Sequence, residues 1–311
     1  MRALSPDFYN DLENVNGLLR PVTEKLLNDH TLMLAIRDGY VNIYYRGGNL
    51  LKIQKSSSSY EVFFDANYNK ESVKLPEIPK NVSTKDEVES LVKLFPYLKE
   101  VMDHYFAKNN KPEREFQQLV ARENNYSSIS NESEYFISDI EFADTEIGAR
   151  FDILAVRWLA SQRKNGSKCV PVLVEMKYGD NALDGSAGLI KHLEDIESMV
   201  SDSSGKYINL LKGMEEQFNQ LDQLKLLNFN RSKSGTVVQL NPEDKPELVL
   251  LLANHNPRSE KLANIVNDEK LSQYADSDFF DLKFFVSSFA GYGMHSDCML
   301  DLSQFRELLN R

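Results

Sequence analysis

Two short apolar segments in the middle of the chain are interrupted by charged residues. Residues 150–156 (RFDILAV) contain Asp152, and a second apolar run ends in Glu175 and Lys177 within residues 174–177 (VEMK). Both segments otherwise have the composition of buried strands. An unpaired charge buried among Ile, Leu and Val costs on the order of several kcal/mol unless a partner or a cation compensates it. Three charges at neighbouring strand ends therefore indicate either structural ion pairs or a metal site.

The segment between the two strands is typical of a hairpin connection. Residues 159–168 (LASQRKNGSK) are polar and contain an Asn-Gly pair, which favours a turn. A hairpin places Asp152 beside Glu175 and Lys177, and the two-residue period of a strand directs Glu175 and Lys177 to one side and Met176 to the other. Two converging carboxylates supply the hard oxygen ligands that suit Mg2+ or Mn2+, and a neighbouring lysine can orient a water or hold a phosphate oxygen. The pattern predicts metal-assisted phosphodiester hydrolysis.

The order of these acidic and basic residues resembles the PD-(D/E)XK nuclease superfamily, which includes many restriction enzymes and the archaeal Holliday-junction resolvases. Residues 151–153 (FDI) stand where that family often has Pro-Asp, and residues 174–177 match its Glu-x-Lys element. Residues 112–117 (PEREFQ) are similar to its first core helix, whose glutamate completes the metal site. Glu113 is the better positional match for that glutamate, and Glu115 is the alternate. The resemblance covers roughly residues 111–200 and extends more loosely to the C-terminus.

The resemblance implies a divalent-metal-dependent nuclease, with DNA as the expected substrate. Asp152 and Glu175 would hold Mg2+ or Mn2+ with help from Glu113 and the backbone carbonyl of Met176, and Lys177 would position the attacking water or stabilise developing negative charge. A second interpretation keeps the fold as an inactive binding or regulatory module, because fold does not imply function. In it Asp152 and Glu175 form ion pairs with Arg150, Lys177 or another cation, and Glu113 only favours the helix dipole.

A helix is predicted after the second strand, because apolar residues at 189, 190, 193 and 196 share one helical face. In the nuclease superfamily a helix at this place crosses the site and sends a polar residue toward it. Lys191 and His192 resemble such residues and are expected to meet a phosphate, unless they lie on a solvated helix face. Tyr178 and Asn181 are further candidates for the rim of the site.

The charge balance limits the interpretation as a nucleic-acid-binding protein. The chain of 311 residues has a formal net charge of -11, whereas DNA affinity comes largely from lysine and arginine at phosphates. We therefore expect a locally basic cleft, a homodimer or protein partner that supplies affinity for DNA, or an unusual substrate.

Composition is that of an ordinary soluble globular protein, with 41% hydrophobic and 27% charged residues. Cys169 and Cys298 show neither a disulfide framework nor zinc-ligand spacing. The first residues, MRALSPDFYN, lack the apolar core of a signal peptide, and no stretch has the length of a membrane span. We expect a cytoplasmic location and no membrane partner.

Residues 1–108 are predicted to form an N-terminal α+β domain of unknown role, which could gate the nuclease by sensing a ligand. A helix capped by Ser5 carries apolar residues up to Leu27, and a second begins near residue 83 or 84 and is kinked at Pro96. Four strands between them read as an antiparallel meander: residues 32–36, 41–45, 50–53 and 60–64. Residues 44–48 (YYRGG) are either half-buried sheet residues or a binding hairpin.

Residues 109–311 are predicted to form the nuclease-like domain, an α/β restriction-endonuclease-like mixed sheet flanked by helices. A long amphipathic helix spans residues 210–227, and apolar strands are expected at 248–253 and 282–288. Further helices are expected from residue 259 and over 302–309. His255 and His295 are isolated in the sequence, so a hydrogen-bonded or exposed histidine is expected at each rather than a metal ligand.

Overall fold

The computed structural model of the protein describes residues 2–70, 74–127, 133–184, 188–229, 236–256 and 258–310. The chain forms two compact units, residues 1–122 with 219–227 and residues 123–218 with 228–311. The boundary predicted between residues 108 and 109 lies between two helices, α4 (Phe95–Lys108) and α5 (Pro112–Asn125).

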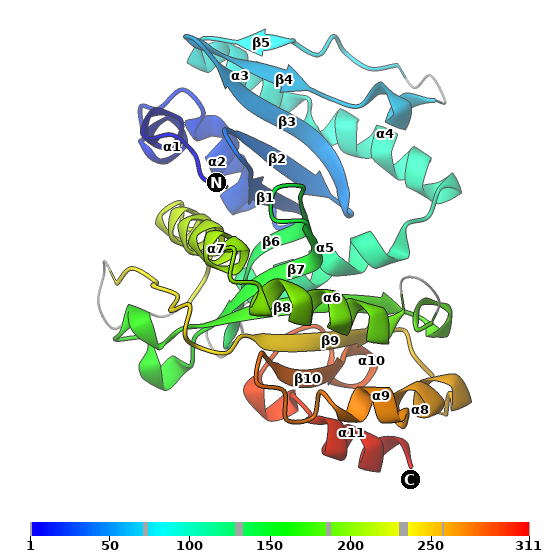
Figure 1. Ribbon diagram of the computed structural model, residues 1–311. Coiled ribbons are helices and arrows are strands. Elements are labelled where there is room, and N and C mark those ends of the chain that lie inside the picture. Colours follow the sequence, from blue (N-terminus) through cyan, green and yellow to red (C-terminus); the bar gives the residue numbers. More distant parts are fainter. Residues whose placement is uncertain are drawn as a thin grey trace. The chain divides into compact units, whose positions relative to one another are not determined.

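The first unit contains a five-stranded sheet in the order β1-β2-β3-β4-β5 (Figure 1). All neighbouring strands pair antiparallel, so the predicted meander is confirmed, and the short β5 is an addition to it. The strands are β1 (Leu32–Ile36), β2 (Tyr40–Tyr45), β3 (Gly48–Ser56), β4 (Ser59–Phe63) and β5 (Asn81–Val82).

The N-terminal helical segment is two helices rather than one, α1 (Pro6–Glu13) and α2 (Arg20–Asn28). The Ser5 hydroxyl caps α1 as predicted by accepting a hydrogen bond from the Phe8 amide. The chain turns sharply at Gly17, where a Cβ atom would lie 2.4 Å from the Asp11 carbonyl oxygen. This close approach ends the helical pattern, and Val15, an apolar residue of the expected stripe, is left 69% exposed.

The second helical segment also divides, into α3 (Lys85–Lys93) and α4. Thr84 and Glu87 form the predicted capping box at the start of α3. Pro96 lies in the first turn of α4, where its missing N–H has no helical acceptor. The predicted kink is therefore a break between two helices.

The turn between β2 and β3 is held against α4 and α5 by polar contacts within the first unit. The Arg46 guanidinium donates from Nε to Glu115 at 2.8 Å and from Nη1 to Asp103 at 2.8 Å. The Gly47 amide donates to Gln118 Oε1 at 2.6 Å. Gly47 has a φ of +73°, and a Cβ atom there would lie 2.4 Å from the Arg114 carbonyl oxygen, so a side chain has no room. Residues 44–48 are thus sheet and turn residues that pack on a helix. This agrees with the interpretation of these residues as half-buried sheet residues rather than as a binding hairpin.

Asp29 at the end of α2 is surrounded by hydrogen-bond donors. Burial alone would raise the pKa of its carboxyl, but hydrogen bonds from Lys99, Thr31 and Lys25 outweigh burial and hold the pKa well below its usual value. Lys99 Nζ lies 2.5 Å from Asp29 Oδ2. The charged form of Asp29 therefore stabilises the first unit.

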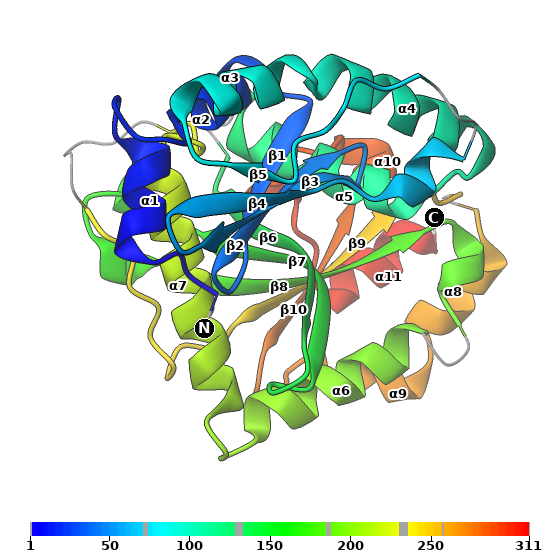
Figure 2. The same ribbon diagram turned by 90° about the horizontal axis from the view of Figure 1, so that it is seen from above.

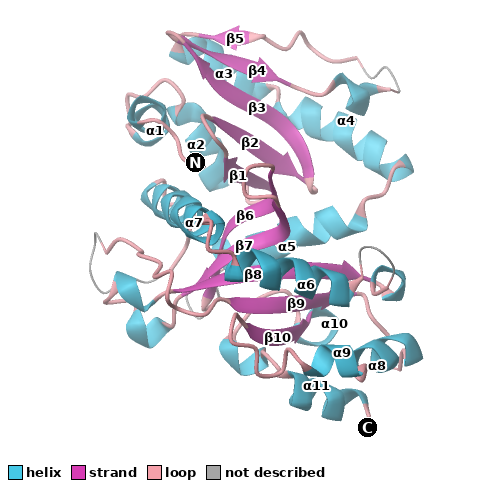
Figure 3. Ribbon diagram, in the orientation of Figure 1, coloured by secondary structure: helices cyan, strands magenta, loops and turns pink. Residues whose placement is uncertain are grey.

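The second unit contains a mixed five-stranded sheet in the order β10-β9-β8-β7-β6 (Figure 3). Strands β6, β7 and β8 pair antiparallel, and β8, β9 and β10 pair parallel. The predicted hairpin that carries Asp152 and Glu175 is confirmed as β7 and β8, and β6 was not predicted. The strands are β6 (Tyr135–Asp144), β7 (Ala149–Arg157), β8 (Val170–Tyr178), β9 (Glu247–Ala253) and β10 (Asp281–Val286).

Helices α6 and α9 lie on one face of this sheet and α10 on the other (Figure 2). The predicted helices after β8, from residue 259 and over 302–309 are confirmed. No helix in the described part of the chain is long and apolar enough to cross a membrane. The remaining helices are α6 (Leu189–Ser201), α7 (Lys206–Gln223), α8 (Glu260–Val266), α9 (Glu269–Ser272), α10 (Ser287–Ala290) and α11 (Leu302–Leu309).

Candidate functional site

The hairpin of β7 and β8 opens at the residues that the sequence singled out. The two strands pair from Arg157↔Val170 as far as Ile153↔Val174, and Asp152 and Glu175 come directly after the last pair. There Asp152 Oδ2 accepts a hydrogen bond of 2.8 Å from the Met176 amide. A carboxylate thus takes the place of a backbone acceptor at the point where the strands separate, and Asp152 and Glu175 are the first residues beyond the last pair.

Glu175 and Lys177 lie on the same side of β8, as the strand period predicted. Lys177 Nζ is 2.7 Å from Glu175 Oε1, and the two side chains are only 7% and 6% exposed. In the parallel ladder with β9, Glu175 is opposite Leu250 and Lys177 is opposite Leu252. A buried ion pair on a central strand is rigidly placed, and removal of either partner leaves an uncompensated charge.

His192 of α6 reaches this ion pair. Its Nε2 atom lies 3.1 Å from Glu175 Oε1, and its side chain is 29% exposed. The neighbouring Lys191 is turned to solvent instead, where its Nζ is 2.6 Å from Asp195 Oδ1. Of the two polar residues predicted on this helix, the structure therefore brings His192 to the site, and a phosphate contact by Lys191 stays a prediction.

His255 fixes the backbone at the end of β8. Its buried ring lies with Nε2 3.0 Å from the Lys177 carbonyl oxygen and with Nδ1 2.9 Å from Asp180 Oδ1. The ring therefore links the Lys177 backbone to the Asp180 side chain. The prediction of a hydrogen-bonded histidine is confirmed here, although no local pattern indicated that this residue would support the backbone of Lys177.

Two predicted rim residues follow Lys177 directly. Tyr178 is half-buried and close to Tyr292, whose pKa is raised by burial and further by Tyr178. Asn181 is exposed in a short turn, Asp180–Ala182. Their contacts with a substrate stay predictions.

Glu113 and Glu115 lie in the first turn of α5, in the first unit. Glu115 accepts two hydrogen bonds from Arg46, at 2.8 Å from Nε and 3.2 Å from Nη2. This pairing gives Glu115 a structural role, so Glu113 is the better candidate for the acid of this helix. Its metal contact stays a prediction.

The donor atoms at the hairpin suit a hard divalent cation. Asp152 and Glu175 supply carboxylate oxygens, and the Met176 carbonyl points to the same side of β8 as the Met176 amide, which faces Asp152. No group of three or more His, Cys, Asp or Glu side chains within the described ranges could hold a metal ion. Mg2+ is commonly held by one or two carboxylates and keeps several waters, so two carboxylates and a carbonyl are a sufficient donor set.

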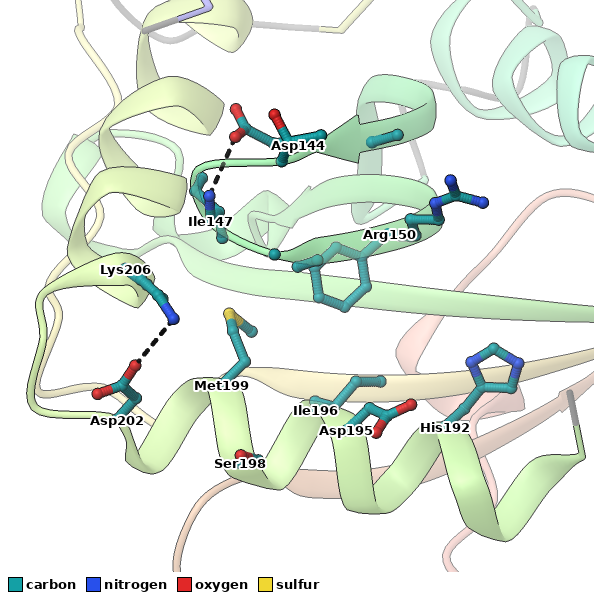
Figure 4. A pocket seen from close by; sticks show the side chains of 15 residues that line it. Asp144, Ile147, Arg150, His192, Asp195, Ile196, Ser198, Met199, Asp202 and Lys206 are labelled. Atoms are coloured by element: carbon teal, nitrogen blue, oxygen red, sulfur yellow. Dashed lines mark hydrogen bonds and ion pairs between the residues drawn. The ribbon is translucent and has the colours of Figure 1, made fainter. Parts of the chain in front are cut away.

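A groove of about 740 Å³ lies beside the site, between the β6–β7 hairpin and α6 (Figure 4). His192 lines one part of it and also contacts Glu175, whereas Asp152, Glu175 and Lys177 do not line it. Arg150, Phe151 and Met199 also line it. The sequence gives no sign of this groove, because its walls come from two segments that only the fold brings together.

Comparison with protein-family models, with curated proteins and with solved structures finds no match to this chain. Function is therefore inferred from the side chains at the point where the pairing of β7 with β8 ends.

Proposed function

We propose that the protein is a divalent-metal-dependent nuclease that hydrolyses phosphodiester bonds, with DNA as its substrate. The observation that carries this proposal is the position of Asp152 and Glu175 directly after the last pair of the β7–β8 ladder, with Lys177 paired to Glu175. The helix that follows β8 sends His192 to Glu175, which agrees with the resemblance to the PD-(D/E)XK superfamily. Cytoplasmic location and a homodimer or protein partner remain predictions from the sequence.

Each residue has a distinct role in this mechanism. Asp152 and Glu175 would supply the metal ligands, with the Met176 carbonyl as a further donor. When bound, Mg2+ or Mn2+ polarises the scissile phosphate and lowers the pKa of a bound water. The Lys177 ammonium, a donor of three hydrogen bonds, orients the water and stabilises negative charge that develops on the phosphate. His192 holds Glu175 in place from α6.

A second candidate function is a nuclease-like binding module without hydrolytic activity. The ion pair between Lys177 and Glu175 favours it, because a lysine that permanently neutralises Glu175 would compete with a cation. The two candidates differ in their response to metal. If the folded protein binds metal and the unfolded chain does not, added metal raises the melting temperature by an amount that depends on metal concentration and affinity. If the acidic residues only form ion pairs, added metal does not raise it.

The test is incubation of the protein with plasmid, single-stranded DNA and RNA under Mg2+ and under Mn2+. Asp152→Asn and Lys177→Met are compared with Asp281→Asn, which removes an exposed carboxylate from β10 of the same sheet. We expect cleavage by the parent protein and by Asp281→Asn, and none by the two site variants. Asp152→Asn protein that cuts as fast as the parent would refute the assignment. A parent protein that neither cuts nor gains thermal stability from either metal would favour the binding module.

A further inference from the structure

The groove between the β6–β7 hairpin and α6 carries an unpaired positive charge. Arg150 is exposed, lines the groove and makes no ion pair with any side chain that the structure describes. The other charged residues of the groove have partners. Asp195 is paired with Lys191 at 2.6 Å, Lys206 with Asp202 at 3.4 Å, and Asp144 accepts hydrogen bonds from the Glu146 and Ile147 amides at 2.9 and 3.1 Å. The groove therefore presents one cation, Arg150, to a ligand.

The middle of the groove is apolar. Ile147 and Phe151 line it from the hairpin, and Ile196 and Met199 line it from α6. In Figure 4 the Ile196 and Met199 side chains rise from α6 toward the hairpin, and His192 lies farther along the same helix. In Figure 4 the Arg150 guanidinium points away from α6, on the opposite side of β7 from Phe151, so it lies at the edge of the groove. The groove therefore suits a ligand whose flat apolar group covers the floor and whose anionic group lies at this edge.

We propose that this groove binds an unpaired strand of nucleic acid beside the scissile phosphate, with a base over the apolar floor and a backbone phosphate at Arg150. This inference rests on the proposed nuclease function, because His192 joins the groove to the candidate metal site. It adds the substrate class, single-stranded or locally unpaired nucleic acid.

The size and charge of the groove favour a single strand over a duplex. A volume of about 740 Å³ is that of a small-molecule site and accommodates individual nucleotides. Duplex affinity depends on many lysine and arginine contacts to phosphates, which this groove lacks in a chain of net charge -11. Binding must then draw on contacts to bases, and only unpaired bases expose their faces to side chains.

Two variants test the groove without altering the candidate metal site. Ala149→Trp places an indole on the same side of β7 as Phe151, within the groove, and Ala160→Trp is the matched control at an exposed position beyond the other end of β7. Arg150→Ala removes an exposed side chain without an ion pair, so it tests the phosphate contact in a fold that is not at risk. Circular dichroism and thermal melting verify that each variant is folded.

Binding is measured by fluorescence anisotropy with the full chain in EDTA, so that neither metal nor cleavage contributes. The probes are labelled oligo-dT, oligo-U and a blunt duplex of the same length. We expect tighter binding of a single strand than of the duplex, and a loss of roughly 5- to 150-fold for Ala149→Trp, the range for one lost base contact. Arg150→Ala should weaken binding and lower the slope of log affinity against log salt by about 0.7, the value for one single-strand phosphate.

The outcomes separate this proposal from the nuclease proposal. Equal affinities for Ala149→Trp and Ala160→Trp, or a duplex bound as tightly as the single strands, would overturn the groove assignment even if the protein cleaves DNA. The absence of any binding by the parent protein would overturn it as well. The expected pattern in EDTA would support the groove even if no cleavage is found with metal. Tighter binding of oligo-dT or of oligo-U then identifies DNA or RNA as the ligand.

Discussion

Replacing Asp152 by asparagine or by alanine separates the charge of this side chain from its structural hydrogen bond. In the Asp152→Asn variant the side-chain amide oxygen can still accept from the Met176 amide, so we expect the free energy of unfolding to fall by less than about 1 kcal/mol. Asp152→Ala leaves that amide without its acceptor, which costs about 1–3 kcal/mol. Because Asp152 is only half-buried and water can reach the amide, the lower half of this range is expected, about 1–2 kcal/mol.

Urea unfolding followed by tryptophan fluorescence measures this difference in the second unit. Trp158, the single tryptophan of the chain, is fully buried directly after β7. Both variants should also lose the rise in melting temperature that Mg2+ or Mn2+ gives the parent protein. Asp281→Asn, an exposed carboxylate on the same sheet, should change neither quantity measurably. Equal destabilisation by the two Asp152 variants would contradict the role of the Met176 hydrogen bond, and an unchanged metal response would contradict the ligand assignment.

Three further predictions concern charged groups in the two units. Lys177→Met leaves the buried Glu175 carboxylate without its lysine and should cost about 3 kcal/mol in urea unfolding; the double variant with Glu175→Gln should regain most of this loss, and additive losses would contradict the pairing. Arg46→Ala removes a partly exposed contact to Glu115 and should lower the unfolding free energy of the first unit by about 1 kcal/mol or less, measured as faster hydrogen exchange in the β2–β3 turn. Because the pKa of Asp29 is lowered in the folded state, its stabilising effect is present above the unfolded pKa and disappears as the pH falls toward the folded value. Asp29→Asn should therefore destabilise at neutral pH and converge with the parent protein in acid, and a constant difference across this titration would refute the sign.

Sequence periodicity predicted most of the strands and helices, because apolar side chains repeat clearly in them. It failed where short-range sterics override the pattern, as at Gly17, whose close approach to Asp11 divides one apolar stripe into two helices. It also missed β6, in which the buried polar residues Ser138 and Asp139 interrupt the apolar run. These two residues lie at a bulge in the pairing with β7, so their side chains do not follow the simple alternation of a strand.

The candidate site was predictable only in part. Asp152, Glu175 and Lys177 were found because charge within apolar strands is costly, which is a local signal. The approach of His192 to Glu175, rather than of Lys191, depends on the rotation of α6 against the sheet. The support of Lys177 by His255 depends on the pairing of β8 with β9, whose residues are far apart in the sequence. The groove at Arg150 likewise exists only once the hairpin and α6 are adjacent.

The first unit is built from two separate segments of the chain, which affects how it forms during synthesis and where the chain can be truncated. Gln220, in the segment 219–227, accepts a hydrogen bond from the Leu4 amide at 3.1 Å and donates one to the Leu4 carbonyl at 3.3 Å. The first unit is therefore complete only when residues 219–227 have been synthesised and have left the ribosome. A fragment that stops after residue 108 or 122 lacks this closing piece, so expression of the N-terminal region alone calls for a fusion that carries residues 219–227.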